Sequence, residues 1–143
     1  MKIDISPSTD LEEIAPILSV LRDKIPRPHL FERLQKAQEN GQNYMIAESA
    51  DKIFGCLSYH ITFDVFWGKT LYIDDLVIDP TLRRKGIGAK LLDAAKSEAK
   101  NRSCDQIRLC SGLTRTEAHR FYEANGFAKT SLQLAHSLNQ GSS

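Results

Sequence analysis

A short basic and glycine-rich turn stands just past the middle of the 143-residue chain. Its residues are Arg83, Arg84, Lys85, Gly86, Ile87, Gly88 and Ala89. A helical apolar period begins at Gly86, and the first backbone N–H groups of a helix are unpaired and carry partial positive charge. Gly86 and Gly88 have no Cβ, so the backbone can closely approach a phosphate. With three basic side chains at the same end, the turn predicts an anion site that suits a pyrophosphate.

Two familiar phosphate-binding motifs do not fit this turn. A dinucleotide-binding fingerprint has a glycine or alanine three residues after Gly88, where Leu91 stands. A P-loop ends in Gly-Lys-Ser/Thr, whereas Gly88 is followed by Ala89 and Lys90. For so short a pattern the alternative stays open that the glycines only relieve strain in a strand-to-helix turn.

Two adjacent carboxylates, Asp74 and Asp75, interrupt a run of bulky apolar residues that predicts a strand over residues 70–78. Burying an unpaired charge is costly, so this pair needs a compensating reason. Successive strand side chains point to opposite faces, so at most one of the two should face a given pocket unless a β-bulge intervenes. The alternative is a surface or strand-end pair without chemistry.

The hydrophobic pattern predicts the elements that position these residues. Helices are expected over residues 11–21, 30–39, 86–100 and 116–125, the last stopped by Gly126. Strands are expected over residues 2–6, 44–48, 53–63, 70–78 and 106–110, with one or two more after Phe127. This order predicts a mixed α/β sheet in one domain. The third helix should bury Ile87, Leu91, Leu92, Ala95 and Ala99.

Composition excludes several classes of protein. Hydrophobic content of 41% and charged content of 26% are ordinary for a globular domain, and a net charge of +1 gives no case for nucleic acid. The apolar runs are too short to span a membrane, and the N-terminus has no export pattern. The three cysteines, Cys56, Cys104 and Cys110, predict neither a metal site nor disulfides, so a reducing cytoplasm is expected.

Two segments resemble the acyl-coenzyme A motif region of the GNAT superfamily of N-acetyltransferases. The first is residues 75–80 followed by Arg83-x-x-Gly86-x-Gly88, and the second is residues 118–127, which include Tyr122 and Gly126. They stand at the family's usual separation. The N-terminal half resembles the family only in the order of its elements.

The resemblance implies a fold and an activity. The fold would be a mixed, mostly antiparallel twisted sheet of six to seven strands, splayed between strands 4 and 5 and flanked by about four helices. Residues 1–138 would form one GNAT domain, with a polar tail over residues 139–143. The activity would be acetyl-CoA-dependent transfer of an acetyl group to a primary amine of a small molecule, by direct attack through a tetrahedral intermediate. Transfer to a protein lysine or N-terminal amine and a non-catalytic acyl-CoA-binding module are the alternatives.

The resemblance also assigns residues to the coenzyme. The strand backbone would pair with the pantetheine arm, the amides of the basic turn would hold the pyrophosphate, and the Arg83 side chain would brace the turn. The residues so assigned are Leu76, Val77, Ile78, Arg83, Arg84, Lys85, Gly86, Ile87, Gly88, Ala89, His119 and Phe121.

An amine must lose its extra proton before it can attack the thioester, and an alkylammonium has a pKa of ~10.4. The departing thiolate is favoured by protonation. Tyr122 resembles the family's tyrosine that reaches the coenzyme sulfur, and is the candidate acid; the alternative is a core aromatic. Asp74 stands where some small-amine transferases carry a glutamate base, and the shorter aspartate would use a relay water. Asp75 would bind a cationic acceptor or brace the sheet.

The remaining candidates concern nucleophile and acceptor. A cysteine nucleophile needs an adjacent base, for which only His119 stands near Cys110; a buried core cysteine is expected instead. Aromatic side chains that could hold a cationic acceptor, or simply pack a hairpin, are Tyr59, His60, Phe63, Phe66 and Trp67. A small-molecule amine is the expected partner, without nucleic acid or membrane, and a homodimer stays open.

Overall fold

The structure, a computed structural model, describes residues 2–139 of the chain. The polypeptide divides into two compact units, with the boundary between Leu109 and Cys110. The predicted mixed α/β class and its four α-helices are confirmed. The predicted sheet of six to seven strands is wrong, because the described residues form one sheet of five strands.

The first unit holds nearly all of the regular structure. Its elements are β1 (Asp4–Ser8), α1 (Leu11–Leu21), α2 (Arg27–Glu39), β2 (Asn43–Ser49), β3 (Lys52–Asp64), β4 (Gly68–Ile78), the 3-10 turn η1 (Pro80–Leu82), α3 (Ile87–Asn101) and β5 (Gln106–Leu109). The second unit holds α4 (Thr116–Ala124).

The first two helices begin at residues that favour a helix start: an aspartate cap for α1 and an early proline for α2. Asp10 is the N-cap of α1, and its Oδ1 accepts from the backbone N–H groups of Glu12 and Glu13 at 3.1 and 3.2 Å. Helix α2 begins at Arg27, three residues before the predicted start. Pro28 lies in its first turn, where a missing N–H costs no helical hydrogen bond.

The strands follow one another in chain order across the sheet. Strands β1 to β4 are antiparallel neighbours, and β4 pairs with β5 in parallel after the crossover through α3. The parallel ladder runs only from Thr70 opposite Gln106 to Ile73 opposite Leu109. Beyond Ile73, the described ladders pair β4 with β3 alone. One backbone edge of β4 therefore lies outside the described sheet pairing over residues 74–78.

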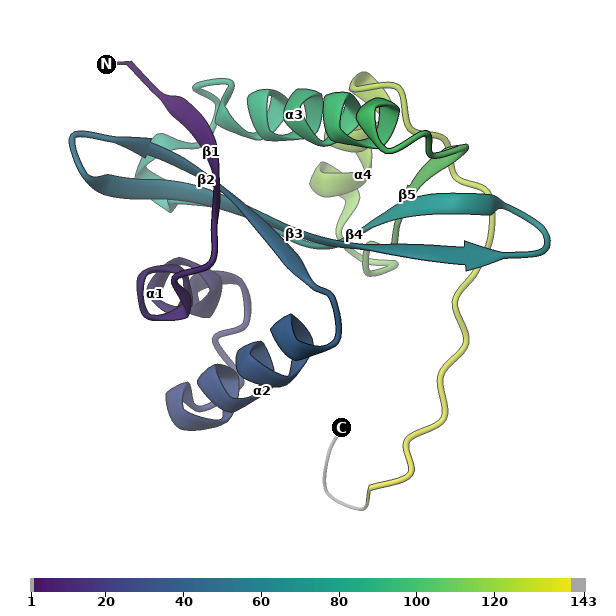
Figure 1. Ribbon diagram of the computed structural model, residues 1–143, viewed down its shortest axis with the longest axis horizontal. Coiled ribbons are helices and arrows are strands. Elements are labelled where there is room, and N and C mark those ends of the chain that lie inside the picture. Colours follow the sequence, from purple (N-terminus) through teal and green to yellow (C-terminus); the bar gives the residue numbers. More distant parts are fainter. Residues whose placement is uncertain (1, 140–143) are drawn as a thin grey trace. The chain divides into compact units, whose positions relative to one another are not determined.

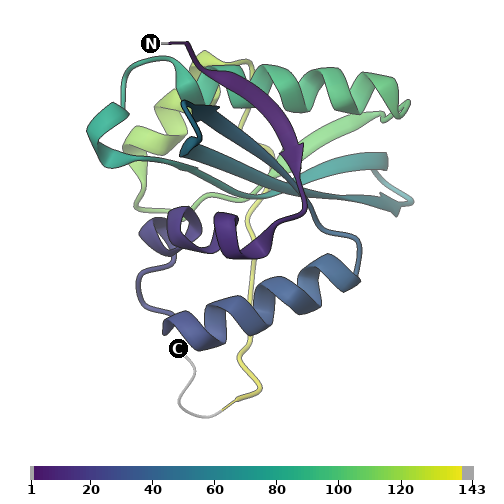
Figure 2. The same ribbon diagram turned by 60° about the vertical axis from the view of Figure 1, so that its left-hand side comes forward.

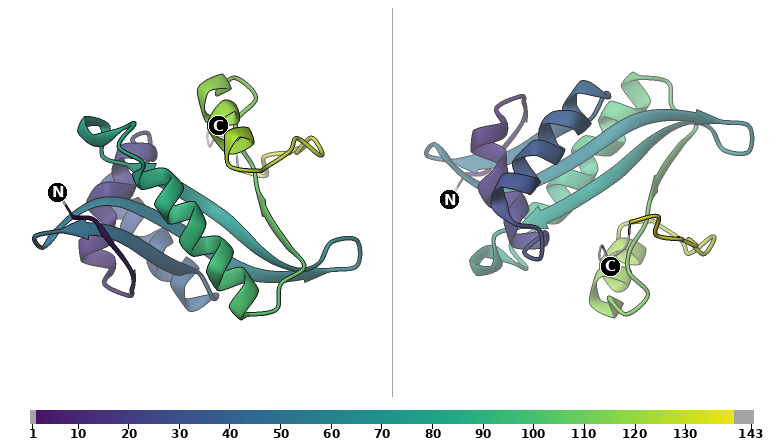
Figure 3. Two further views of the ribbon diagram at one scale, coloured as in Figure 1. Left: turned by 90° about the horizontal axis from the view of Figure 1, so that it is seen from above. Right: turned by 90° about the horizontal axis from the view of Figure 1, so that it is seen from below.

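Helices cover both faces of the sheet in the first unit. Helices α1 and α2 lie on one face and α3 on the other, as Figures 1 and 2 show. Helix α3 runs across the strands in the view from above (Figure 3). It buries the five residues predicted from its period, Ile87, Leu91, Leu92, Ala95 and Ala99. On the opposite face, α1 and α2 bury their own apolar stripes against β2, β3 and β4.

The second unit is built around α4. Its predicted stop at Gly126 is confirmed, since Gly126 has a φ of +95°. The Phe127 N–H donates to the Tyr122 carbonyl at 3.0 Å and the Gly126 N–H to the Glu123 carbonyl at 3.1 Å, which is the hydrogen-bond pair of a Schellman motif.

The strands predicted after Phe127 are a further correction. Residues 128–139, all described, contain neither strand nor helix. Leu132, Leu134 and Leu138 stand exposed there, at 73%, 92% and 90%. Leu132 and Leu134 alternate with polar residues, as in a half-buried strand, but a strand also needs a neighbouring strand to pair with.

Membrane-spanning helices were also not expected. Among residues 2–139, every helix is too short or too polar to span a membrane.

Candidate active site

A β-bulge places both carboxylates of the acidic pair on one face of the sheet. Ser58 on β3 is opposite Asp75, but the next residue, Tyr59, is opposite Ile73. Asp74 is thus the extra residue of the bulge. In a regular strand, Asp74 and Asp75 would point to opposite faces, as the sequence alone predicted.

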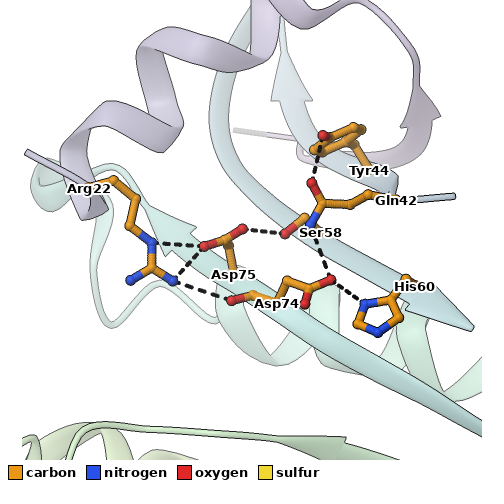
Figure 4. A network of polar contacts seen from close by, with 7 residues as sticks. All are labelled: Arg22, Gln42, Tyr44, Ser58, His60, Asp74 and Asp75. Atoms are coloured by element: carbon orange, nitrogen blue, oxygen red, sulfur yellow. Dashed lines mark hydrogen bonds and ion pairs between the residues drawn. The ribbon is translucent and has the colours of Figure 1, made fainter. Parts of the chain in front are cut away.

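The contacts of neighbouring side chains identify this face. Tyr44, Ser58 and Asp75 are in register across β2, β3 and β4, and the Tyr44 hydroxyl lies 3.4 Å from the Leu34 carbonyl of α2. The row therefore faces α1 and α2. Tyr59 faces the other way, since its hydroxyl donates to Glu98 of α3 at 3.3 Å. Figure 4 shows Asp74 and Asp75 with their partners on the first of these faces.

Asp75 is fully compensated by hydrogen bonds. Its Oδ1 accepts from Nε and Nη2 of Arg22 at 2.9 and 2.6 Å, and its Oδ2 accepts from the Ser58 hydroxyl at 2.6 Å. The side chain is 14% exposed. Both oxygens are engaged within the fold, which is the arrangement of a brace between α1, β3 and β4.

Asp74 has a different set of partners. Its Oδ2 lies 2.7 Å from Nδ1 of His60 and accepts from Nε2 of Gln42 at 3.1 Å (Figure 4). The Tyr44 hydroxyl donates to Oε1 of Gln42 at 2.7 Å. Burial, followed by the nearby Cys56 and the two aspartates, raises the pKa of Tyr44 well above its usual value. Tyr44 therefore stays a proton donor at neutral pH, and this fixes the Gln42 amide with its NH₂ toward Asp74.

The basic turn has the geometry of an anion site. Gly86 is the N-cap of the 15-residue α3, has a φ of +79° and offers no side chain to its first N–H groups. A Cβ built at Gly86 would meet nothing within 4 Å, so the backbone is open on that side. Arg83, Arg84 and Lys85 are exposed, and the described residues supply no ion-pair partner for them. These observations fit a pyrophosphate.

Hydrogen bonds also fix the segment that connects β4 to the basic turn. The Asp79 N–H donates to the Phe54 carbonyl at 2.7 Å, and Asp79 Oδ1 accepts from the N–H and hydroxyl of Thr81 at 2.9 and 2.7 Å. Those two bonds lower the pKa of Asp79. Arg84 takes a φ of +68°, an uncommon backbone conformation for a non-glycine residue.

The strand segment assigned to the pantetheine arm presents its backbone rather than its side chains. Val77 is buried in the cluster formed with α1 and α2, and Ile78 lies against Gly55 toward α3. Leu76, Val77 and Ile78 pair with Leu57, Cys56 and Gly55 of β3. Their backbone groups on the opposite edge lie outside the described ladders.

The second unit contains the other predicted site residues. The Tyr122 ring lies 5.4 Å from the Phe121 ring and 5.9 Å from the Phe127 ring, centroid to centroid. Tyr122 and Phe127 thereby make the apolar contact that accompanies a Schellman motif. His119 Nε2 lies 2.8 Å from the Gly112 carbonyl, an acceptor that requires the proton on Nε2.

One expectation about a neighbouring residue needs correction. Cys110 was expected to be a buried core cysteine, but it is exposed. The aromatic residues of the hairpin differ in their surroundings: Tyr59 is buried toward α3, whereas Phe63 and Phe66 are 76% and 83% exposed. Within residues 2–139, no group of three or more His, Cys, Asp or Glu side chains could hold a metal ion.

Sequence reasoning missed the polar partners of the carboxylate pair. Arg22, Gln42, Tyr44 and Ser58 come from three separate segments, and His60 was considered only as an aromatic face. One signal was present: Ser58 and His60 are two residues apart on a predicted strand, so they share a face. Nothing in the sequence marks Arg22, which acts through its place after the end of α1.

Comparison with known proteins gives a consistent result. The model of the acetyltransferase (GNAT) family matches residues 11–127. Aminoalkylphosphonate N-acetyltransferase of Salmonella typhimurium is 28% identical over 97 residues, which make up 67% of this chain and only 63% of that relative. The uncharacterized N-acetyltransferase YhdJ of Bacillus subtilis is 32% identical over 111 residues, covering 77% of this chain and 78% of the relative.

A solved structure shares the fold. The aminoglycoside N-acetyltransferase AAC(6')-Iy, in complex with the bisubstrate analogue CoA-S-monomethyl-acetylneamine, matches with a TM-score of 0.84 at 18% identity. The match covers 97% of this chain and 99% of that one.

Proposed function

Because the chain belongs to the acetyltransferase (GNAT) family and is an N-acetyltransferase of that type, we propose that it transfers the acetyl group of acetyl-CoA to a primary amine of a small molecule. The amine attacks the thioester carbonyl directly, through a tetrahedral intermediate. The similarity to an aminoalkylphosphonate N-acetyltransferase supports a small acceptor. Residues 1–138 act as one functional domain, since the family match crosses the boundary between the two units.

The observation that carries the proposal is the open, basic N-terminus of α3. Backbone N–H groups from Arg84 to Ala89 hold the pyrophosphate, and the exposed basic side chains supply the charge. The backbone edge of residues 76–78 that lies outside the described ladders accepts the pantetheine arm by strand-like pairing. Bound acetyl-CoA supplies the activated acetyl group.

The two carboxylates have separate roles in the proposal. Asp75, with both oxygens engaged by Arg22 and Ser58, braces the sheet. Asp74 belongs to the proton-accepting side of the reaction, since its contacts are with His60 and Gln42 rather than with a basic side chain. Tyr122 is proposed as the donor to the departing thiolate, on its match to the family's tyrosine. His119 and Phe121, on the same helix, are proposed coenzyme contacts.

A thiol-release assay tests the reaction class. Acetyl-CoA is supplied with a panel of aminoalkylphosphonates, free amino acids, aminoglycosides and polyamines, and in parallel with peptides bearing lysine or a free N-terminus. We expect the highest kcat/KM with a small amine. Turnover of peptides alone would replace the proposal by protein acetylation. Binding of acetyl-CoA by calorimetry with no turnover on either panel would make the chain a coenzyme-binding module.

A further inference from the structure

We propose that His60 is the base that takes the proton from the acceptor amine, with Asp74 and Gln42 as positioning residues that hold its ring. This inference rests on the proposed acetyl transfer and identifies the proton acceptor within it. It replaces the relay water that a short aspartate base would need.

The contact between His60 and Asp74 determines which ring nitrogen is available. An ionised carboxylate only accepts hydrogen bonds, so the proton of the 2.7 Å contact belongs to Nδ1 of the neutral imidazole. Nε2 then carries the lone pair. Figure 4 shows the second ring nitrogen on the side of the ring away from Asp74. The side chain is 37% exposed, and no partner of Nε2 is described among residues 2–139.

The ring is held from several sides. Asp74 is itself fixed by Gln42, whose orientation is set by Tyr44 on β2. The His60 ring lies 5.4 Å from the Tyr72 ring on β4. A base that is already oriented loses little freedom when it accepts the proton, and this favours catalysis.

The described side-chain contacts around His60 include one charged partner. Asp74 is the anion in contact with it, while the neighbouring Arg22 and Asp75 pair with each other. Gln42, which precedes β2, contacts Asp74 through its neutral amide, and Tyr44 on β2 contacts Gln42. Asp74 is less accessible to an acceptor amine than His60, because its Oδ2 already contacts Gln42 and His60 and its side chain is only 25% exposed.

The location of His60 and Asp74 suits an amine that attacks a coenzyme-bound acetyl group. Asp74 stands two residues before Leu76, and strands rise ~3.3 Å per residue. Asp74 therefore lies about 7 Å along β4 from the segment assigned to pantetheine. His60 neighbours this stretch across the β3–β4 ladder, where it is opposite Tyr72.

The proton balance is complete with the groups named. The ammonium gives one proton to Nε2 of His60, and the imidazolium releases it to solvent through its exposed side. The free amine nitrogen bonds to the carbonyl carbon, and the carbon–sulfur bond breaks. The second proton leaves the nitrogen for solvent as the amide forms, while the thiolate takes one proton from the acid, Tyr122, which solvent then reprotonates. Ammonium and thioester thus give amide, thiol and one released proton.

The deciding variant is His60→Asn, whose side-chain NH₂ can replace Nδ1–H toward Asp74 but which lacks Nε2. We expect kcat/KM at pH 7 to fall ~10²–10⁴-fold, the usual contribution of a general base. The deficit should shrink as pH approaches ~10, where alkylammonium ions lose their proton unaided. Added imidazole should partly restore His60→Ala. His29→Asn, at an exposed site on α2, is the matched control and should retain wild-type kcat/KM.

A second readout does not depend on turnover. NMR of ¹⁵N-histidine-labelled protein should show His60 as the Nδ1–H tautomer in the wild type, and loss of that tautomer in Asp74→Asn. An Nε2–H tautomer in the wild type would overturn the inference, as would wild-type kcat/KM in His60→Asn at pH 7. If the wild type acetylates no amine at all, the proposed reaction fails and the base assignment fails with it. Turnover by the wild type that His60→Asn leaves intact refutes the base assignment alone.

Discussion

Arg22 and Asp75, 53 residues apart in the chain, meet through two hydrogen bonds to a single oxygen. Nε and Nη2 of Arg22 lie 2.9 and 2.6 Å from Oδ1 of Asp75. The residue that caps the C-terminus of α1 is thereby tied to the middle of β4. Because Ser58 takes the other oxygen, Asp75 is committed to the fold while its neighbour Asp74 contacts His60.

Removal of this tie should weaken the fold. In Arg22→Ala, the nearly buried Asp75 loses both contacts to Oδ1, and we expect the free energy of unfolding to fall by ~1–3 kcal/mol. Urea denaturation followed by circular dichroism measures it. Arg33→Ala, on the exposed side of α2, is the control and should change the value by less than ~0.5 kcal/mol. Equal values for the two variants would show that the pair does not stabilise the sheet.

The basic turn can be tested with two matched glycines. Gly86 and Gly41 both have positive φ, at +79° and +96°, and neither has an atom within 4 Å of a built Cβ. Glutamate should therefore strain both sites similarly. Only Gly86→Glu should abolish acetyl-CoA binding, because it places bulk and negative charge at the N-terminus of α3. Calorimetric titration of both variants decides this, and similar affinities would refute the assigned pyrophosphate site.

Tyr122→Phe should separate chemistry from binding. The ring contacts with Phe121 and Phe127 do not need the hydroxyl, so the variant should fold and bind acetyl-CoA with nearly unchanged Kd. Loss of the proton donor should lower kcat ~10²-fold or more. An acetyl thioester of a more acidic thiol should show a smaller loss, since its thiolate leaves without help. A uniform loss across donors would argue against the acid role.

Asp79 should make the stability of the segment between β4 and the basic turn depend on pH. The hydrogen bonds from Thr81 hold the pKa of Asp79 below its reference value of 3.8. The stability from this group is therefore fully present above 3.8 and is lost as pH falls through the lower folded value. Thr81→Val removes one bond and should raise the pKa of Asp79 toward 3.8. A ¹³C NMR titration of the carboxyl group measures the shift, with Thr130→Val as the unaffected control.

Cysteine reactivity tests direct attack on the thioester. Burial, with a smaller contribution from Asp75, raises the pKa of Cys56 to about 12. At pH 8 we expect iodoacetamide to modify the exposed Cys110 long before Cys56, as mass spectrometry of digests would show. Cys110→Ser should retain wild-type kcat, because the amine attacks without an acyl-cysteine. An acetylated Cys110 peptide after mixing with acetyl-CoA would contradict this.

Much of the fold could be predicted because its signals are local. Asp10 caps α1 through its own side chain, and the period of α3 marks the five residues that it buries. Gly126 ends α4 because only a residue that tolerates positive φ closes a Schellman motif there. The final strands failed for the converse reason. Alternation at Leu132 and Leu134 is necessary for a strand, but pairing with a neighbour is what forms one.

The sequence by itself determined the basic turn, the helix that follows it and the acidic pair, since each is a matter of residue types at fixed spacing. Only the tertiary structure decided what the acidic pair does. One extra residue in β4 turns Asp74 to the same face as Asp75, and segments far apart in the chain then supply Arg22 to one and His60 to the other. Partners brought together across strands depend on register, and register is set by the packing of the whole sheet.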